Sequence, residues 1–175
     1  MIRILTMGDL SPETLEFVSR RLYAAYGVGA ELSGDADAHR NAFDDDQNAW
    51  DAAALLKETK GVKTFADDKL LFLTTDPLAL PPGPMGAKGP VFGYAQYGGE
   101  RAIATSAQLT GMGLDDGLAK RAAHHVGHLF DLHHCFDPRC AMYPEWAPPF
   151  AQFPEVLLCP FCREKSERRI RLAGT

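Results

Sequence analysis

The 175-residue sequence has no long hydrophobic run and no excess of positive charge. No stretch approaches the roughly 18 apolar residues that a membrane-spanning helix needs. The first ten residues lack the apolar core and the small-residue cleavage site of a signal peptide. The formal net charge of −5 provides no positive field that would attract phosphates or anionic lipids. We therefore expect a cytoplasmic protein whose partners include neither nucleic acid nor a membrane.

Internal repeats and low-complexity tracts are also missing, and the composition is that of an ordinary globular protein, with 46% hydrophobic and 23% charged residues. A chain of this length accommodates one domain, or a large lobe with a small appendage.

Strand and helix patterns alternate over residues 1–132, which predicts an N-terminal α/β subdomain. The predicted strands cover residues 2–7, 28–32, 69–75, 91–97 and 101–105, and the predicted helices cover 12–26, 47–60 and 114–130. From residue 133 to residue 175, cysteines, prolines and aromatic residues replace this periodicity. We expect a small C-terminal subdomain there.

The cysteines and most of the histidines gather in this last part of the chain. Five of the six histidines fall within 11 positions, and the four cysteines occupy the last 41 residues. The cysteines are Cys135, Cys140, Cys159 and Cys162. Disulfides suit small secreted chains in an oxidising compartment, so this clustering favours metal binding instead.

Two histidines have the spacing of metal ligands. His124 and His128 lie four positions apart on a predicted helix, which places their side chains on one face, about 6 Å apart. His134 supplies a third ligand if the helix ends near Asp131 and the chain turns back. If the helix continues, Asp131 faces the metal instead and replaces His134. The plainer alternative is a set of surface histidines.

Four cysteines with one C-x-x-C pair match the chemistry of a tetrathiolate zinc site, which can hold together a proline-rich segment that has little core of its own. Redox disulfides or a lone reactive thiol are the alternatives.

The segment HHVGHLFDLHH at residues 124–134 resembles the zinc-binding consensus of the metzincin metallopeptidases, H-E-x-x-H-x-x-G-x-x-H. The junction of His134 with Cys135, followed by Cys140, Met142 and the later C-P-F-C at 159–162, is similar to the archaemetzincins in particular.

This resemblance implies a metzincin-like α/β fold, with a mixed twisted sheet, an edge strand over the cleft, an active-site helix and a cysteine-zinc C-terminal subdomain. It implies peptide-bond hydrolysis by zinc-bound water and two zinc ions. By position, His124, His128 and His134 hold the catalytic zinc, the four cysteines hold a structural zinc, and Met142 forms a turn beneath the histidines. The edge strand that pairs with a peptide or protein substrate is Phe92, Gly93, Tyr94, Ala95 and Gln96.

Two positions depart from the consensus. His125 stands where such peptidases have the glutamate that acts as general base, work typically worth 10²- to 10⁴-fold in rate. A neutral imidazole can also accept a proton, so His125 is the candidate catalytic residue at this position. It is bulkier than a carboxylate, and the metal repels its protonated form, so we expect lost or strongly reduced activity. Asp131 replaces the glycine that ends the helix, and aspartate tolerates the left-handed conformation required there.

The alternative to a divergent peptidase is a catalytically inactive, zinc-dependent peptide-binding module that holds its ligand on the edge strand. A weaker alternative is a zinc-ribbon protein that binds nucleic acid through residues 163–172, which include five basic and two acidic residues.

Overall fold

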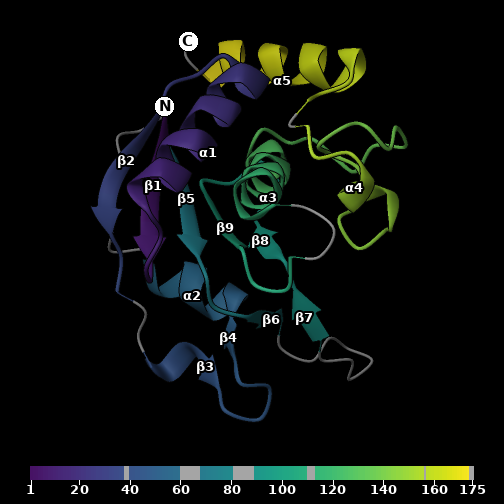
Figure 1. Cartoon of the computed structure of the whole chain (residues 1–175). Helices are drawn as coiled ribbons and strands as arrows, with labels where there is room; N and C mark the ends of the chain where they lie inside the picture. The colour runs from purple at the N-terminus through teal and green to yellow at the C-terminus, as the bar shows by residue number, and fades with distance from the viewer. Residues whose placement is uncertain (38–39, 60–67, 81–88, 110–112, 156, 174–175) are drawn as a thin grey trace.

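The computed structural model describes all but a few short segments of the chain (Figure 1). The described residues are 1–37, 40–59, 68–80, 89–109, 113–155 and 157–173. Within these ranges, every helix is too short or too polar to cross a lipid bilayer.

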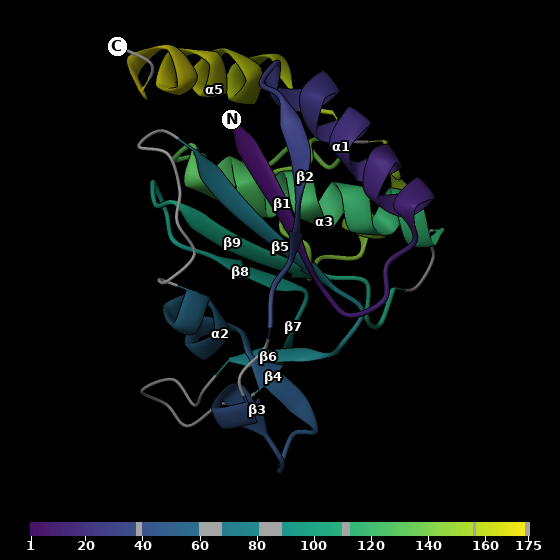
Figure 2. The ribbon, with the colours of Figure 1, turned by 90° about the vertical axis from the view of Figure 1, so that its left-hand side faces the viewer.

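A mixed five-stranded sheet forms the centre of the molecule, with the strand order β2-β1-β5-β9-β8 (Figures 1 and 2). The strands are β1 (Ile2–Met7), β2 (Ala30–Asp35), β5 (Lys69–Thr74), β8 (Gly93–Ala95) and β9 (Arg101–Thr105). The first four in this order run parallel, while β8 pairs antiparallel with β9 at the edge. The sheet confirms the α/β fold and its edge strand.

Helices cover both faces of this sheet. On one face lie α1 (Pro12–Tyr26) and α3 (Leu114–Leu129), and on the other lies α2 (Ala52–Glu58). Two further helices, α4 (Pro149–Gln152) and α5 (Pro160–Ala173), follow α3 in the chain. Side chains alternate along a strand, so Leu71 and Leu73 of β5 pack under α1 and α3. Leu70 and Phe72 pack with α2 on the opposite face. Because both faces are buried, β5 is apolar at almost every position.

A second, four-stranded sheet has the order β3-β4-β6-β7. Its strands are β3 (Phe43–Asp44), which follows a short 3₁₀ turn at Arg40–Ala42, β4 (Ala49–Asp51), β6 (Leu78–Leu80) and β7 (Gly89–Val91). Figure 2 shows this sheet beyond one end of the larger one, next to α2.

Two predicted elements differ from the structure. The strand predicted at 91–97 is divided between the two sheets at Phe92, whose ring lies under the guanidinium of Arg121, 4.1 Å from its centroid. The helix predicted at 47–60 begins only at Ala52. Asp51 ends β4 and caps this helix, because its side chain accepts from the N–H groups of Ala53 and Ala54 at 2.9 Å each.

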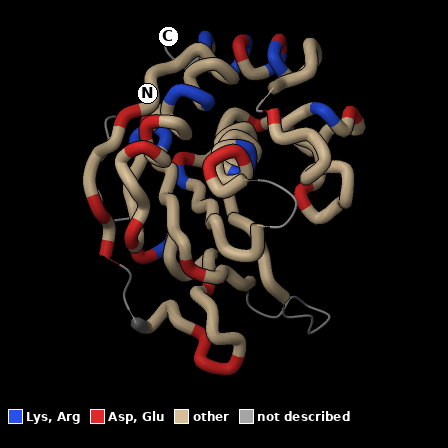
Figure 3. Tube along the Cα trace, in the orientation of Figure 1, with Lys and Arg blue, Asp and Glu red and all other residues tan. Residues whose placement is uncertain are grey.

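The C-terminal part contributes to the same buried cluster as α1 and α3, through residues that include Ala141, Met142, Leu158 and Cys162. The helix α5 lies against α1. It carries both basic and acidic residues (Figure 3), and nucleic-acid binding through this helix stays the weaker alternative. The division of the chain at residue 133 stays a prediction.

Candidate active site

The end of helix α3 determines where the chain goes next. Asp131 takes the left-handed conformation, with φ of 59°. Its N–H donates to the His128 carbonyl at 3.0 Å, and the Leu132 N–H donates to the Gly127 carbonyl at 2.9 Å. These two bonds form the Schellman turn that most often uses glycine at this position. The turn reverses the chain, so that the segment after it returns toward the helix.

This reversal decides which residue joins the two helical histidines. The ligand nitrogens of His124, His128 and His134 all lie within 4.8 Å of one another. Asp131 is not part of this cluster, because its carboxylate forms an ion pair with Arg169 of α5. The alternative in which the helix runs on and Asp131 faces the other two histidines is therefore not the observed geometry.

Backbone carbonyls orient two of the three imidazoles. Nδ1 of His124 lies 2.8 Å from the Ala141 carbonyl, and Nδ1 of His128 lies 2.8 Å from the Leu132 carbonyl. A carbonyl oxygen only accepts, so both Nδ1 atoms carry the proton and both Nε2 atoms present a lone pair. The two Nε2 atoms are 3.0 Å apart.

Two lone pairs at this distance repel each other unless a cation lies between them. A proton is a poor candidate, because burial lowers the pKa of His124 to about 3 and that of His128 to about 4. Carbonyl-anchored imidazoles that converge through Nε2 are the usual arrangement around zinc. The three histidines therefore fit a zinc ion with an open position.

His125 points to a different partner. Its Nε2 lies 3.1 Å from Oε1 of Glu145, and the two side chains are only 5% and 9% exposed. Burial alone raises the pKa of the Glu145 carboxyl, but the charge and the hydrogen bond of His125 outweigh burial and lower it to about 2. Glu145 is therefore an ionised carboxylate beside the histidine cluster. No motif in the sequence marks Glu145 as a site residue.

The ring of His125 lies directly against the edge strand. A Cβ atom on Gly93 would stand 2.2 Å from Nε2 of His125 and 2.4 Å from the Ile103 carbonyl oxygen. Such contacts are too short for any side chain, so only glycine at position 93 lets α3 and β8 enclose this imidazole.

A cleft of about 340 Å³ connects these parts. Its walls include the three clustered histidines, His125, Glu145, Trp146, Leu80, Tyr97 and the edge of the sheet from Pro90 to Ala95. Of the predicted edge-strand residues, Phe92, Gly93, Tyr94 and Ala95 line this cleft. Gln96 follows β8, and its N–H reaches the Arg101 carbonyl at 3.5 Å.

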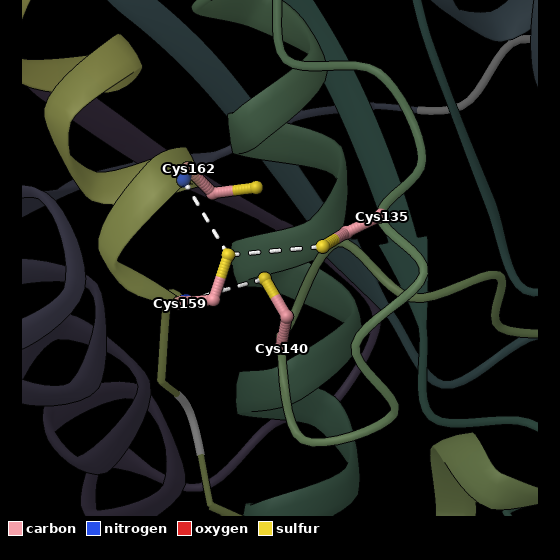
Figure 4. Close-up of side chains that lie close together, drawn as sticks. All are labelled: Cys135, Cys140, Cys159 and Cys162. Atoms are coloured by element: carbon pink, nitrogen blue, oxygen red, sulfur yellow. Dashed lines mark hydrogen bonds between the residues drawn. The ribbon is translucent and has the colours of Figure 1, made fainter.

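The four cysteines form a cluster separate from the histidines (Figure 4). Their sulfur atoms all lie within 4.8 Å of one another, and those of Cys135 and Cys159 are 3.7 Å apart. A disulfide requires about 2.05 Å, whereas a tetrahedral zinc with Zn–S of about 2.3 Å places its sulfurs about 3.8 Å apart. The cluster therefore fits zinc.

Backbone N–H groups surround these sulfur atoms. The N–H of Cys159 lies 3.4 Å from Sγ of Cys140, and the N–H of Cys162 lies 3.5 Å from Sγ of Cys159 (Figure 4). A hydrogen bond from the Cys162 thiol lowers the pKa of Cys140 to about 6. Thiolate is the form that binds a metal.

Met142 is fully buried against helix α3 and lies two residues after Cys140 in the sequence. The backbone carbonyl of its neighbour Ala141 orients His124, and its own carbonyl accepts from the Cys135 N–H at 2.8 Å. The turn at Met142 thus holds one residue of each predicted metal site.

Comparisons with known proteins agree with this geometry, although no model of a protein family matches the sequence. A segment of 78 residues is 35% identical to the archaemetzincin of Pyrobaculum aerophilum; it spans 45% of this chain and half the length of that relative. The crystal structure of the archaemetzincin from Methanopyrus kandleri matches 97% of this chain and 94% of its own, with a TM-score of 0.80 and 21% identity. The fold is that of the archaemetzincins.

A second structure, a zinc-dependent peptidase from Methanocorpusculum labreanum, matches 95% of this chain and all of its own, with a TM-score of 0.77 and 23% identity. The resemblance to archaemetzincins in the sequence is thus confirmed for the fold, including the sheet and the active-site helix. Within this archaemetzincin-like fold, the pair formed by His125 and Glu145 stands next to the zinc-type histidine cluster.

Proposed function

We propose that this protein is a zinc-dependent peptidase that hydrolyses peptide bonds in its cleft. The observation that carries this proposal is the convergence of His124, His128 and His134 through their free ring nitrogens, at the wall of a cleft bounded by a sheet edge. A bound zinc supplies a Lewis acid that polarises the scissile carbonyl and activates a water molecule. The chain's own residues orient the peptide and handle the proton.

The edge strand β8 supports a peptide substrate. It is antiparallel to β9, and among the described residues no second strand pairs with it within its sheet. An extended peptide adds to such an edge through main-chain hydrogen bonds, and side-chain pockets then give specificity. Because β8 lines the same cleft as the histidines, a peptide paired there passes in front of them.

We propose a second, structural zinc at Cys135, Cys140, Cys159 and Cys162. This site connects the chain after His134 to the start of α5, over a segment that contributes few core residues. All four cysteines are free thiols. A thiolate zinc site suits a reducing compartment, which supports a cytoplasmic protein.

The test is hydrolysis of a mixed peptide library, followed by mass spectrometry, with zinc-loaded protein. We expect new termini that disappear after chelation, return with added zinc and are absent in the His128→Ala variant, which keeps the cysteine site. Cleavage that is equally fast in His128→Ala would contradict the proposal.

The second candidate function is zinc-dependent peptide binding without hydrolysis. The observation that favours it is His125, whose imidazole occupies the position of the usual general-base carboxylate. The same library distinguishes the two: binding alone predicts that peptides are retained by the zinc-loaded protein but recovered intact.

A further inference from the structure

The cleft holds two buried polar atoms that have no hydrogen-bond partner among the described residues. They are Oε2 of Glu145 and Nδ1 of His125, and the other polar atoms of these side chains bond to each other. Buried polar atoms without partners are rare in folded proteins and call for an explanation, such as a ligand or a catalytic role. Here both belong to side chains that line the cleft beside the three clustered histidines.

We propose that Glu145 is the general base of this site, and that His125 is its positioning residue. The carboxylate that archaemetzincin-like helices carry next to the first histidine enters here from the loop after Met142, twenty residues later. This inference rests on the proposed peptidase function and names a residue that performs its proton transfer.

Glu145 is held in place from two sides. His125 fixes Oε1, and the His125 ring is itself confined between α3 and Gly93 of β8. The loop that carries Glu145 is folded through successive turns, with Ala147 N–H donating to the Pro144 carbonyl at 3.1 Å. Farther along, the ammonium of the fully buried Lys120 donates to the Phe150 carbonyl at 2.8 Å. The carboxylate is therefore fixed by the fold rather than free to swing.

Cations near the carboxylate keep it in the form that accepts a proton. Arg121 lies one turn before His125 on α3, and its charge acts on Glu145. Its guanidinium is bound to the carbonyls of Thr105 and Ala107 at 2.7 Å each, so it stays in place without neutralising the carboxylate directly. Oε2 is buried and has no partner among the described residues, and it is the atom that we assign to the attacking water.

The proposed step balances as ordinary hydrolysis. An O–H bond of the attacking water breaks, its proton passes to Oε2 of Glu145, and the oxygen forms a bond with the peptide carbonyl carbon. As the C–N bond breaks, Glu145 returns the proton to the leaving nitrogen. The products are a carboxylic acid and an amine, which become a carboxylate and an ammonium when the acid proton passes to the amine, and His125 keeps its hydrogen bond throughout.

The experiment compares four zinc-loaded proteins: the native chain, Glu145→Gln, the double variant His125→Glu with Glu145→Gln, and the control Glu155→Gln, which changes an exposed glutamate in the same segment. Glutamine keeps the size of Glu145 but cannot accept the proton. We expect Glu145→Gln to lower kcat by about 10²-fold or more while KM and zinc content stay near native values. The double variant, which returns a carboxylate to position 125, should recover at least about tenfold, and Glu155→Gln should behave as native.

Each other outcome has one meaning. Native cleavage with undiminished Glu145→Gln activity overturns the role of Glu145 and leaves the peptidase proposal standing. Loss of zinc in Glu145→Gln makes the residue a metal ligand and overturns its role as base. An inactive native chain contradicts both proposals, and cleavage by the double variant alone would show that the native site lacks a working base.

The positioning role of His125 has its own measurement. His125→Gln retains an N–H donor for Oε1 of Glu145, whereas His125→Ala does not. We expect kcat to fall by at least about tenfold more in His125→Ala than in His125→Gln, with KM alike in both. Equal losses would contradict positioning through the hydrogen bond.

Discussion

The sulfur of Met142 packs against the Cα of Gly127, on the buried side of helix α3. A Cβ atom at position 127 would stand 2.2 Å from this sulfur and 2.8 Å from the hydroxyl of Tyr26. Tyr26 in turn donates to the Ala123 carbonyl at 2.5 Å. Because Gly127 has no side chain, the turn at Met142 can approach helix α3 closely between the two helical histidines.

Gly127→Ala should destabilise the protein and weaken zinc binding by the histidines. The added methyl group forces Met142 and Tyr26 apart, and overpacking of this kind typically costs about 1–3 kcal/mol, of which the better helix propensity of alanine recovers about 1. Because Ala141 adjoins Met142 and orients His124, the histidine site moves as well. Urea unfolding and zinc titration measure both effects. The control is Gly89→Ala, since a Cβ at Gly89 meets nothing within 4 Å; a Gly127→Ala protein as stable as this control would refute the argument.

Asp131 and Arg169 provide a second prediction, because the helix-ending residue has two roles. Asp131→Asn keeps the tolerance for a left-handed backbone and removes only a partly exposed ion pair, so we expect a loss within about 1 kcal/mol. Asp131→Ala loses both, and its unfolding free energy should fall by about 1–2 kcal/mol more. Asp131→Gly should lie near the native value, because the relieved backbone offsets the lost ion pair. Denaturant unfolding of all three variants measures the order of their unfolding free energies. Equal unfolding free energies for Asp131→Ala and Asp131→Asn would show that the left-handed backbone conformation costs nothing.

Local patterns predicted the parts of the fold that local chemistry determines. The apolar runs of β1, β5 and β9 and the amphipathic spacing of α1 and α3 appear where the sequence indicates them, because burial on one or both faces leaves a period in the sequence. The division of residues 91–97 at Phe92 was not predicted. Phe92 packs against Arg121, which lies 29 residues later in the sequence, so no local pattern predicts the division.

The site shows the same distinction. Spacing brought His124 and His128 together, but the choice between Asp131 and His134 required the backbone conformation at Asp131 and the position of Arg169 on α5. Glu145 could not be selected from its own surroundings in the sequence, because its partner His125 is twenty residues away and an acidic residue in a proline-rich loop is ordinary. The one available signal was the missing glutamate at position 125, because its absence indicates that a base carboxylate has to come from another part of the chain.

The lowered pKa values of His124 and His128 predict an unusual pH dependence of zinc binding. Ordinary histidines, with a pKa of about 6.5, bind more protons as the pH falls from 7.5 to 5.5, so zinc must displace more of them at the lower pH. Here burial lowers the two pKa values to about 3 and about 4, so both imidazoles are already neutral across this range. Proton release from His124 and His128 on zinc binding should therefore not increase from pH 7.5 to 5.5, so any increase over this range is limited to the contribution of His134, whose pKa burial also lowers. Calorimetry in buffers of different ionisation enthalpy measures it, with the cysteine site loaded throughout; an increase of about two protons at pH 5.5 would contradict the burial argument.

The two metal sites should differ in what their loss does to the fold. Cys159→Ser removes one of four ligands from a cluster in which Cys140 and Cys162 belong to the buried core, and thiolate zinc sites contribute folding free energy directly. His134→Ala removes the least buried of the three clustered histidines and leaves His124 and His128 anchored to their carbonyls. We expect Cys159→Ser to lower the Tm by about 10 °C or more, because the lost ligand removes several kcal/mol of folding free energy, on the order of a disrupted thiolate site. We expect His134→Ala to lower the Tm by only about a few degrees. Elemental analysis should find about one zinc fewer in each variant than in the native protein. Equal changes in Tm would mean that the histidine site also supports the fold, and native zinc content in either variant would mean that the substituted residue is not a ligand.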